Sequence, residues 1–420
     1  MNLLAAAALG ALALLAFLAR RSALFPPVLL AGGWAVALLL LNLPADVFYP
    51  IGDGTRLFYV VAAAVFLLGG IAGSSLLRGY GTPPPARVEW DTRRLGFLLD
   101  FLIVVLLIAL PVYWRELQAA ARQTAIENLL IAARVRSLRS ELGLGTEIPW
   151  ILSILGQMSI AFTFVAFAPR ARSPWWHGRR TILFLLSLGL QLTTGGRAGV
   201  VALVGGVLGI VWIGERRVRV AVVLPLLVAM LLTSAFVAIQ LEKGLVRRAA
   251  GLRGNVPALV ADLQWYALGP VVGFDRVLRE PDALPSTGGV GRTVAELANS
   301  FGADIEIPPR HAQYTTVGDF REVNAYTAYY WYLGDLGIPG AMFFIWLAGL
   351  VTTLAFEWAW AGSLGGRVVY GVAFAGVGQS VYSEALFTNV NFVAKSLIVL
   401  AALYWIAGRA RDRPPAEGAA

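Results

Sequence analysis

The sequence predicts an all-α protein with many transmembrane helices, and three observations support this. Of its 420 residues, 58% are hydrophobic and only 14% are charged, whereas about a quarter of the residues of soluble domains are charged. The apolar residues fall in uncharged runs long enough to cross a bilayer, which takes roughly 20 residues of helix. Arginines gather in the short segments between these runs, as is typical of loops that face the cytoplasm.

Each apolar run predicts one membrane span, and we expect about eleven spans. They are expected at residues 2–19, 23–43, 57–77, 96–114, 149–168, 181–195, 198–214, 219–240, 338–357, 368–384 and 390–408. The first run has no basic residue before it and no small-residue cleavage site before Arg20. We therefore interpret it as a retained span and not as a signal peptide.

Short arginine-rich loops predict the orientation of the chain. On this count one side holds Arg20, Arg21, Arg78 to Arg94, Arg170 to Arg180, Arg216 to Arg219, Arg367 and Arg409 to Arg413. The C-terminus then lies in the cytoplasm and the N-terminus outside, because long loops translocate regardless of their charge. We therefore divide the chain into a transmembrane bundle (1–241), a large external loop or cap of helices and loops (242–337), and a C-terminal part with further spans and a short tail (338–420).

A second external segment, 115–148, lies within the first part and has the pattern of an amphipathic helix. Apolar residues such as Ile126 and Leu130 recur on one side, and arginines such as Arg134 lie elsewhere. Such a helix lies in the membrane interface with its arginines toward lipid headgroups. A direct part in substrate binding is the alternative.

The composition excludes several kinds of site. The chain has no cysteine and two histidines, His177 and His311. Disulfides, cysteine-ligated metals and a thiol nucleophile are therefore excluded, and a centre built from several histidines is not expected. Because the external loop also lacks a DxD-like pair of carboxylates, we expect no metal and no cofactor.

Cations are concentrated in the external loop, at Lys243, Arg247, Arg248, Arg253, Arg276, Arg279, Arg292, Arg310 and Arg321. The guanidinium group is well shaped for two-pronged contact with phosphate oxygens. The group as a whole predicts a site for a phosphate or pyrophosphate. The alternative for any one arginine is an ion pair with one of the nearly as numerous carboxylates of the loop.

Arg197 stands apart, because it follows Thr194, Gly195 and Gly196 between two short apolar runs. A charge at a helix break near the membrane is costly unless it is paired or faces a hydrated cavity. A broken helix pair with an arginine at its apex is therefore a candidate anion site. The alternative is that the side chain extends to the external headgroups.

A general base is expected in the same loop. His311 is its one histidine, and neighbouring arginines favour the neutral form that accepts a proton. Glu322 and Asp319 are the competing carboxylates. Tyr314 follows His311 closely and is a candidate for sugar binding.

The last part of the loop is rich in aromatic residues, from Asn324 through Tyr326 and Thr327 to Asp335, and leads directly into a span. Aromatic residues at this position form either an interfacial belt or a platform for a sugar, whose hydroxyl groups would bond to Asn324 and Asp335. Composition does not decide between the two.

These motifs resemble those of the bacterial O-antigen polymerases of the Wzy type, the oligosaccharide repeat-unit polymerases. The resemblance lies in Asn324–Ala325–Tyr326–Thr327, in the following tyrosines with Gly334–Asp335–Leu336–Gly337 and Gly340, and in Thr194–Gly195–Gly196–Arg197. The many spans and the large late external loop also fit this family. The related O-antigen ligases often have a histidine beside the loop asparagine, where this chain has Val323, which disfavours a ligase.

The resemblance implies a GT-C-like membrane glycosyltransferase of the bacterial inner membrane, active on the periplasmic face in cell-envelope lipopolysaccharide synthesis. It would transfer a glycan from undecaprenyl pyrophosphate to another lipid-linked repeat unit. Its partners would be these lipid-linked glycans, membrane lipids, a flippase and a chain-length regulator, and no nucleic acid. The residues assigned to pyrophosphate are Arg197, Arg247, Arg248, Arg276, Arg292 and Arg310. His311 or Glu322 would be the base, and Tyr314, Asn324, Tyr326, Thr327 and Asp335 would form the sugar-binding motif.

Three other functions stay open. A ligase would perform the same chemistry on a different acceptor. A transporter of lipid-linked saccharides would require charges spread through its helices and an internal repeat, whereas Asp100, Glu357, Glu384 and Lys395 lie near the predicted span ends. A non-catalytic scaffold for polysaccharide assembly is the third.

Overall fold

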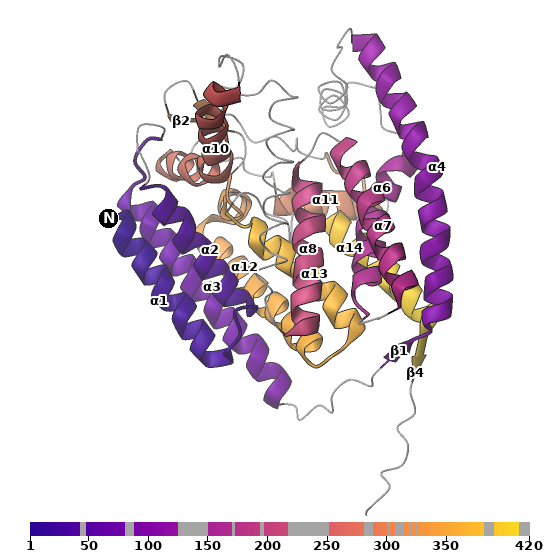
Figure 1. Cartoon of the computed structure of the whole chain (residues 1–420). Helices are drawn as coiled ribbons and strands as arrows, with labels where there is room; N and C mark the ends of the chain where they lie inside the picture. Colours follow the sequence, from indigo (N-terminus) through magenta and orange to yellow (C-terminus); the bar gives the residue numbers. More distant parts are fainter. Residues whose placement is uncertain are drawn as a thin grey trace, which may run out of the picture.

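The computed structural model describes residues 1–42, 48–79, 88–124, 150–169, 173–193, 197–216, 252–280, 289–300, 303–306, 315–318, 321–323, 326–381 and 390–410. Most of these residues are helical, which confirms the expected class (Figure 1). The helices are α1 (Asn2–Arg20), α2 (Pro26–Leu40), α3 (Asp53–Gly79), α4 (Thr92–Thr124), α6 (Trp150–Phe167), α7 (Pro174–Thr193), α8 (Arg197–Glu215), α10 (Leu252–Arg279), α11 (Val290–Ser300), α12 (Tyr329–Trp360), α13 (Leu364–Gln379) and α14 (Val390–Ala407).

Four of the described helices, α1, α3, α4 and α12, are long and apolar enough to cross a membrane. Shorter apolar helices cover Pro26–Leu40, Ile154–Phe167, Gly199–Glu215 and Ser396–Ala407. The predicted span 219–240 lies outside the described residues. The chain is therefore a helical membrane protein by the length and composition of its helices.

Two short antiparallel strand pairs were not predicted. The first joins β1 (Val88–Trp90) to β4 (Gly408–Ala410), and the second joins β2 (Thr315–Gly318) to β3 (Arg321–Val323). The β1–β4 pair brings together two segments that the arginine count assigns to the same side. The pairing could not be read from the sequence, because each strand is short and its partner lies far along the chain.

The bundle has two ends, which are opposite each other in Figure 1. The α10 end holds α10, the β2–β3 pair and the first residues of α3 and α12. The arginine end holds the β1–β4 pair, the last residues of α1, α3, α8 and α12, and the first residues of α4, α7 and α13. All the described arginines that we predicted to be cytoplasmic lie at the arginine end, as far as the structure describes this side of the chain.

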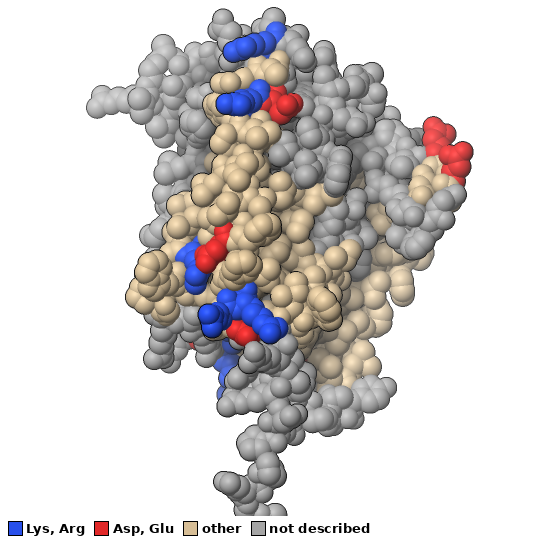
Figure 2. Space-filling view, turned by 90° about the vertical axis from the view of Figure 1, so that its right-hand side faces the viewer, with Lys and Arg blue, Asp and Glu red and all other residues tan. Residues whose placement is uncertain are grey.

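The surface between the two ends is apolar on α4. Figure 2 shows charged side chains in groups toward the top and the lower part, with an uncharged band between them. The exposed residues of this helix include Phe97, Phe101, Val104, Leu107, Ile108 and Val112. A band of this kind suits the hydrocarbon core of a bilayer.

The helices α3 and α12, which begin at the α10 end, pack closely against each other. Helices α3 and α12 cross at glycines: a Cβ atom on Gly69 would lie 2.0 Å from the carbonyl oxygen of Trp346, and one on Gly349 would lie 2.1 Å from that of Phe66. Small residues at such contacts are typical of helix pairs in membranes, because they let the backbones approach. Any larger side chain at Gly69 or Gly349 would force the two helices apart.

Several helix boundaries differ from the prediction, and the largest differences are at the end of α4 and the start of α12. Helix α4 continues to Thr124, ten residues past the predicted end at 114, so the beginning of segment 115–148 extends a span. Helix α12 begins at Tyr329 and not at 338, but it is kinked at Gly337, where φ is 65°. Glycine adopts this left-handed conformation without strain. The predicted span therefore corresponds to the part of α12 that follows the kink.

Candidate functional site at the α10 end

The structure describes the side chains of four predicted site residues, namely Arg276, Tyr326, Thr327 and Asp335. Arg197 begins α8, Arg292 lies in the first turn of α11 and Glu322 lies in β3, but their side chains are not among the described ones. The other predicted site residues lie outside the described residues: Arg247, Arg248, Arg310, His311, Tyr314 and Asn324, together with Asp319 as a competing base.

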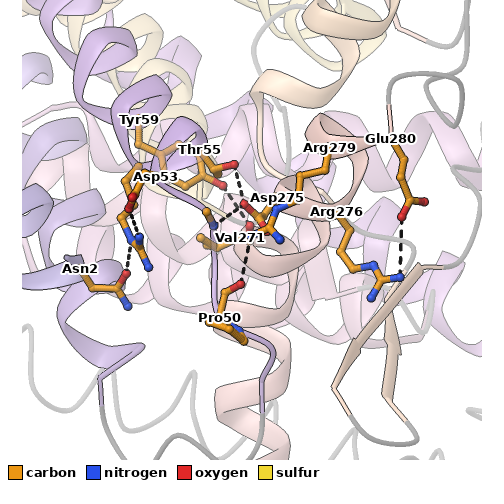
Figure 3. Close-up of polar contacts among 12 residues, drawn as sticks. Asn2, Pro50, Asp53, Thr55, Tyr59, Val271, Asp275, Arg276, Arg279 and Glu280 are labelled. Carbon is orange, nitrogen blue, oxygen red and sulfur yellow. Dashed lines mark hydrogen bonds and ion pairs between the residues drawn. The ribbon is translucent and has the colours of Figure 1, made fainter.

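A buried carboxylate attaches α10 to the start of α3 (Figure 3). Asp275 is 2% exposed, and its Oδ1 accepts hydrogen bonds of 2.7 Å from the backbone N–H of Gly52 and from the hydroxyl of Thr55. Its Oδ2 lies 2.9 Å from Nη2 of Arg279. A carboxylate at a helix N-terminus is favoured by the helix dipole and by the unpaired N–H groups there. Asp275 therefore fixes the C-terminal half of α10 against α3.

Aromatic packing continues this attachment into the bundle. The hydroxyl of Tyr59 donates to the carbonyl oxygen of Val271 over 3.0 Å. The ring of Tyr59 lies 4.2 Å from that of Trp34 and 5.7 Å from that of Phe274, and Tyr329 stacks on Trp34 at 5.3 Å. These rings come from α2, α3, α10 and α12. Large rings of this kind bury much apolar surface, so the α10 end has a rigid base.

The aromatic segment near Asn324 belongs to this core. Tyr326, Tyr329, Tyr330 and Tyr332 are all buried, and Tyr326 stacks on Tyr330 with ring centroids 4.2 Å apart. Packing into the core is a role that the sequence did not predict beside the interfacial belt and the sugar platform. The sequence missed this role because burial depends on α10 and α2, which are far along the chain.

Two glycines of α10 let Val323 and Tyr326 pack closely against this helix. A Cβ atom on Gly269 would lie 2.8 Å from Cγ1 of Val323, and one on Gly273 would lie 2.8 Å from its Cγ2 and 3.2 Å from the Tyr326 ring. Residues four apart share a helix face, so Gly269 and Gly273 form one shallow surface on which β3 and Tyr326 rest. This spacing is a signal that was readable in the sequence and was not used.

Arg276 is the one predicted pyrophosphate ligand with a described side chain. Its guanidinium lies 5.6 Å from the ring centroid of Tyr49 and 3.9 Å from the carboxylate of Glu280, and the side chain is 39% exposed. Tyr49 in turn donates its backbone N–H to the carbonyl of Val317 in β2. Arg276 is thus held beside the β2–β3 pair with its charged group at the surface.

Asp335 holds a helix by contacts that the motif did not predict. Its Oδ2 accepts hydrogen bonds from the backbone N–H groups of Gly289 (3.2 Å) and Gly291 (3.0 Å). These groups lie at the start of α11, where N–H groups have no partner within the helix. Asp335 thus acts as a tertiary cap of α11, and Arg292 is the next residue after Gly291. This contact fixes the turn that carries Arg292, and the expected sugar contact of Asp335 stays a prediction.

The two remaining motif residues lie inside the protein. Thr327 is fully buried, and the N–H of the adjacent Ala328 donates to the carbonyl of Ser380 at the end of α13 over 2.9 Å. Burial raises the pKa of Tyr326 to about 12, so its hydroxyl stays protonated at neutral pH and is a donor. Tyr326 therefore does not compete with His311 or Glu322 for the role of base.

No family model, no curated protein and no solved structure matches this chain. The resemblance to the repeat-unit polymerases therefore rests on the motif residues and on the order of the spans. We define the candidate site by the contacts of Asp275, Arg276, Val323 and Asp335.

Proposed function

We propose that this chain is a polymerase of oligosaccharide repeat units linked to undecaprenyl pyrophosphate, in the inner membrane of a bacterium. The proposal includes eleven spans, with the arginine end in the cytoplasm and the α10 end in the periplasm. The observation that supports it best is the close packing of Val323 and Tyr326 against Gly269 and Gly273 of α10. On this basis β3, with Glu322, and the cation Arg276 belong to one end of the bundle.

The proposed reaction is a direct displacement at the anomeric carbon of the donor glycan. The bond from this carbon to the pyrophosphate oxygen breaks, and the electron pair leaves with the pyrophosphate. A hydroxyl oxygen of the acceptor sugar forms the new bond, so the configuration inverts. The hydroxyl proton passes to His311 or Glu322 as general base.

Guanidinium groups stabilise the charge that develops on the leaving group. In this proposal Arg276 acts with Arg197, Arg247, Arg248, Arg292 and Arg310 on the pyrophosphate oxygens, a contact for which guanidinium is well suited. Asp335 takes part indirectly, because it fixes the first turn of α11, where Arg292 lies.

The test is polymerisation by purified protein with synthetic undecaprenyl-pyrophosphate repeat units, read as a ladder of products on a gel. We expect a ladder of products in the presence of EDTA. We also expect Arg276→Ala to lower the rate about tenfold or more, because a charge-assisted contact to phosphate contributes about 1.5–3 kcal/mol. The matched control is Arg122→Ala, which removes an exposed arginine in the last turn of α4 and which we expect to leave the rate unchanged.

Other results would replace the proposal. Transfer to lipid A core without a ladder would identify a ligase. Movement of the lipid-linked saccharide across liposomes without any transfer would identify a transporter. Loss of the ladder in EDTA with recovery on adding manganese would refute the metal-independent mechanism.

A further inference from the structure

A seam of buried polar side chains joins α6 to α7 inside the bundle. The hydroxyl groups of Thr163 and Ser187 lie 2.9 Å apart, and both side chains are fully buried. Ser187 also lies within hydrogen-bond distance, 3.2 Å, of the carbonyl oxygen of Ser159, and the Ser159 hydroxyl donates to the carbonyl oxygen of Gly156 over 2.7 Å. Hydrogen bonds of this kind hold membrane helices together. The reaction proposed above uses none of these residues.

Gln191 ends this polar seam on the side of the α10 end. It follows Ser187 by four residues on α7, so the two side chains share a helix face. Gln191 is 7% exposed, and its Nε2 donates to the carbonyl oxygen of Gly156 over 3.0 Å. This hydrogen bond to α6 fixes the orientation of the amide group and therefore the position of its Oε1.

The amide oxygen of Gln191 lies against the first turn of α8. A Cβ atom on Gly199 would lie 2.2 Å from Oε1 of Gln191 and 3.1 Å from its Cδ. Gly199 is the third residue of α8, which begins at Arg197. The N–H groups in the first turn of a helix have no partner within it, and an amide oxygen is a hydrogen-bond acceptor. The absence of a side chain at Gly199 is what lets this acceptor approach the turn.

These contacts connect the turn that carries Arg197 to two other helices. Gln191 belongs to α7, is bonded to α6 and lies against α8. Because Arg197 is the first residue of α8, a shift of this turn moves the backbone from which its guanidinium extends. A misplacement of about 1 Å can lower the rate of a catalysed reaction by a factor on the order of 100.

We propose that Gln191 is a positioning residue that sets the first turn of α8, and through it Arg197, for contact with a pyrophosphate group. This inference rests on the proposed function, in which Arg197 contacts the pyrophosphate of the lipid-linked glycan. Gln191 acts through this turn and not on the reacting atoms, since its side chain is buried between helices.

The first test is binding of undecaprenyl pyrophosphate to the purified full chain in detergent, measured by native mass spectrometry. Undecaprenol is the control probe, because it has the same chain and no phosphate. Gln191→Leu removes the amide and keeps a side chain of similar size. We expect it to weaken undecaprenyl pyrophosphate about tenfold, as Arg197→Ala should, and undecaprenol by less than about twofold. An equal loss for both probes would show general damage to lipid binding and would overturn the inference.

Two glycine substitutions give a matched pair around the same amide group. Gly199→Ala displaces Oε1 of Gln191, whereas a Cβ atom on Gly156 would lie 3.7 Å from Nε2, an ordinary contact. Alanine is the better helix former at both positions, so a weaker α8 cannot explain an effect of Gly199→Ala. We expect Gly199→Ala to weaken undecaprenyl pyrophosphate as Gln191→Leu does, with little further loss when the two are combined. Gly156→Ala should change this affinity by less than about twofold.

Ser187→Ala separates positioning from a general loosening of the polar seam. It removes the contacts with Thr163 and Ser159 one turn away from Gln191. It should lower the thermal unfolding midpoint by a few degrees or about that, and should change the affinity for undecaprenyl pyrophosphate by less than about twofold. A loss of affinity equal to that of Gln191→Leu would assign the effect to the seam as a whole and would overturn the inference.

Hydrogen exchange and polymerisation separate a failure of this inference from a failure of the proposed function. In Gln191→Leu, exchange in the first turn of α8 should quicken, and products should form about tenfold more slowly. Unchanged exchange with unchanged binding would overturn the inference and leave the polymerase proposal in place. A wild type whose binding of undecaprenyl pyrophosphate depends on Gln191 but which forms no polymer would support the inference and refute the polymerase.

Discussion

The two ends of the bundle use their charged residues in different ways. At the arginine end, side chains pair with side chains on other helices: Arg20 of α1 with Glu357 of α12, which also accepts from Ser74 of α3, and Arg179 of α7 with Asp100 of α4. At the α10 end, the carboxylates Asp275 and Asp335 accept hydrogen bonds from the backbone at the starts of α3 and α11.

This difference indicates a division of roles. Pairing between side chains at the arginine end joins α1, α3, α4, α7 and α12 into one frame. At the α10 end the carboxylates are used to fix loops and helix starts, and the guanidinium groups of Arg276 and Arg279 remain partly exposed. An end built in this way can present cations to a ligand on a rigid backbone.

The largest effect is expected from Asp275→Ala. This change removes the acceptor of the Gly52 N–H and the Thr55 hydroxyl, and the partner of Arg279, in a buried position. We expect a loss of about 3 kcal/mol in the free energy of unfolding, because buried donors are left without partners. The loss is measured by denaturant unfolding in detergent. Hydrogen exchange should quicken in α10 before it does in α4.

Asp53→Ala is the control for this prediction. Asp53 is paired with Arg56 on the same helix but is largely exposed, so its loss should cost less than about 1 kcal/mol. Equal losses in the free energy of unfolding for Asp275→Ala and Asp53→Ala would contradict the stabilising role of the buried carboxylate at the α10 end.

A smaller effect is expected from Glu357→Ala at the arginine end. The substitution leaves Arg20 and Ser74 without their carboxylate, and both partners of the ion pair are mostly buried. We expect a loss of about 2 kcal/mol in the free energy of unfolding. Arg94→Ala, which breaks an exposed ion pair with Asp91, should cost less than about 1 kcal/mol. If Glu357→Ala also abolished polymerisation without loss of stability, this end would have more than a structural role.

The smallest effect on stability is expected at Asp335. Asp335→Ala should cost about 1 kcal/mol, the usual contribution of a helix cap, and should speed hydrogen exchange in α11. Asp335→Asn should restore protection, because an amide oxygen also accepts from N–H groups.

Gly291→Pro provides an independent check of the Asp335 contact. Proline removes the N–H that Asp335 accepts from and is tolerated in the first turn of a helix. Combined with Asp335→Ala it should add little further loss, since both changes remove the same hydrogen bond. Additive effects would show that the carboxylate of Asp335 acts elsewhere.

The sequence was sufficient for features that depend on neighbouring residues. Runs of apolar residues near Asn2–Arg20 and Asp53–Leu77 are recognisable because each helix satisfies its own backbone hydrogen bonds. The candidate loop was recognisable by its composition and motif. Its contacts were not, because nothing in the motif indicates that the carboxylate of Asp335 accepts hydrogen bonds at the start of α11.

What the sequence by itself determined is therefore the helical class, the places of the long apolar helices that the structure describes, and the end of the bundle at which the described arginines gather, because each depends on local hydrophobicity and charge. Only the tertiary structure decided which carboxylate meets which partner. Asp275 bonds to Gly52 from 223 residues away, and Arg20 pairs with Glu357. These contacts require several helices to pack first, and the packing depends on shape at positions such as Gly69 and Gly273 that a single sequence does not distinguish from other glycines.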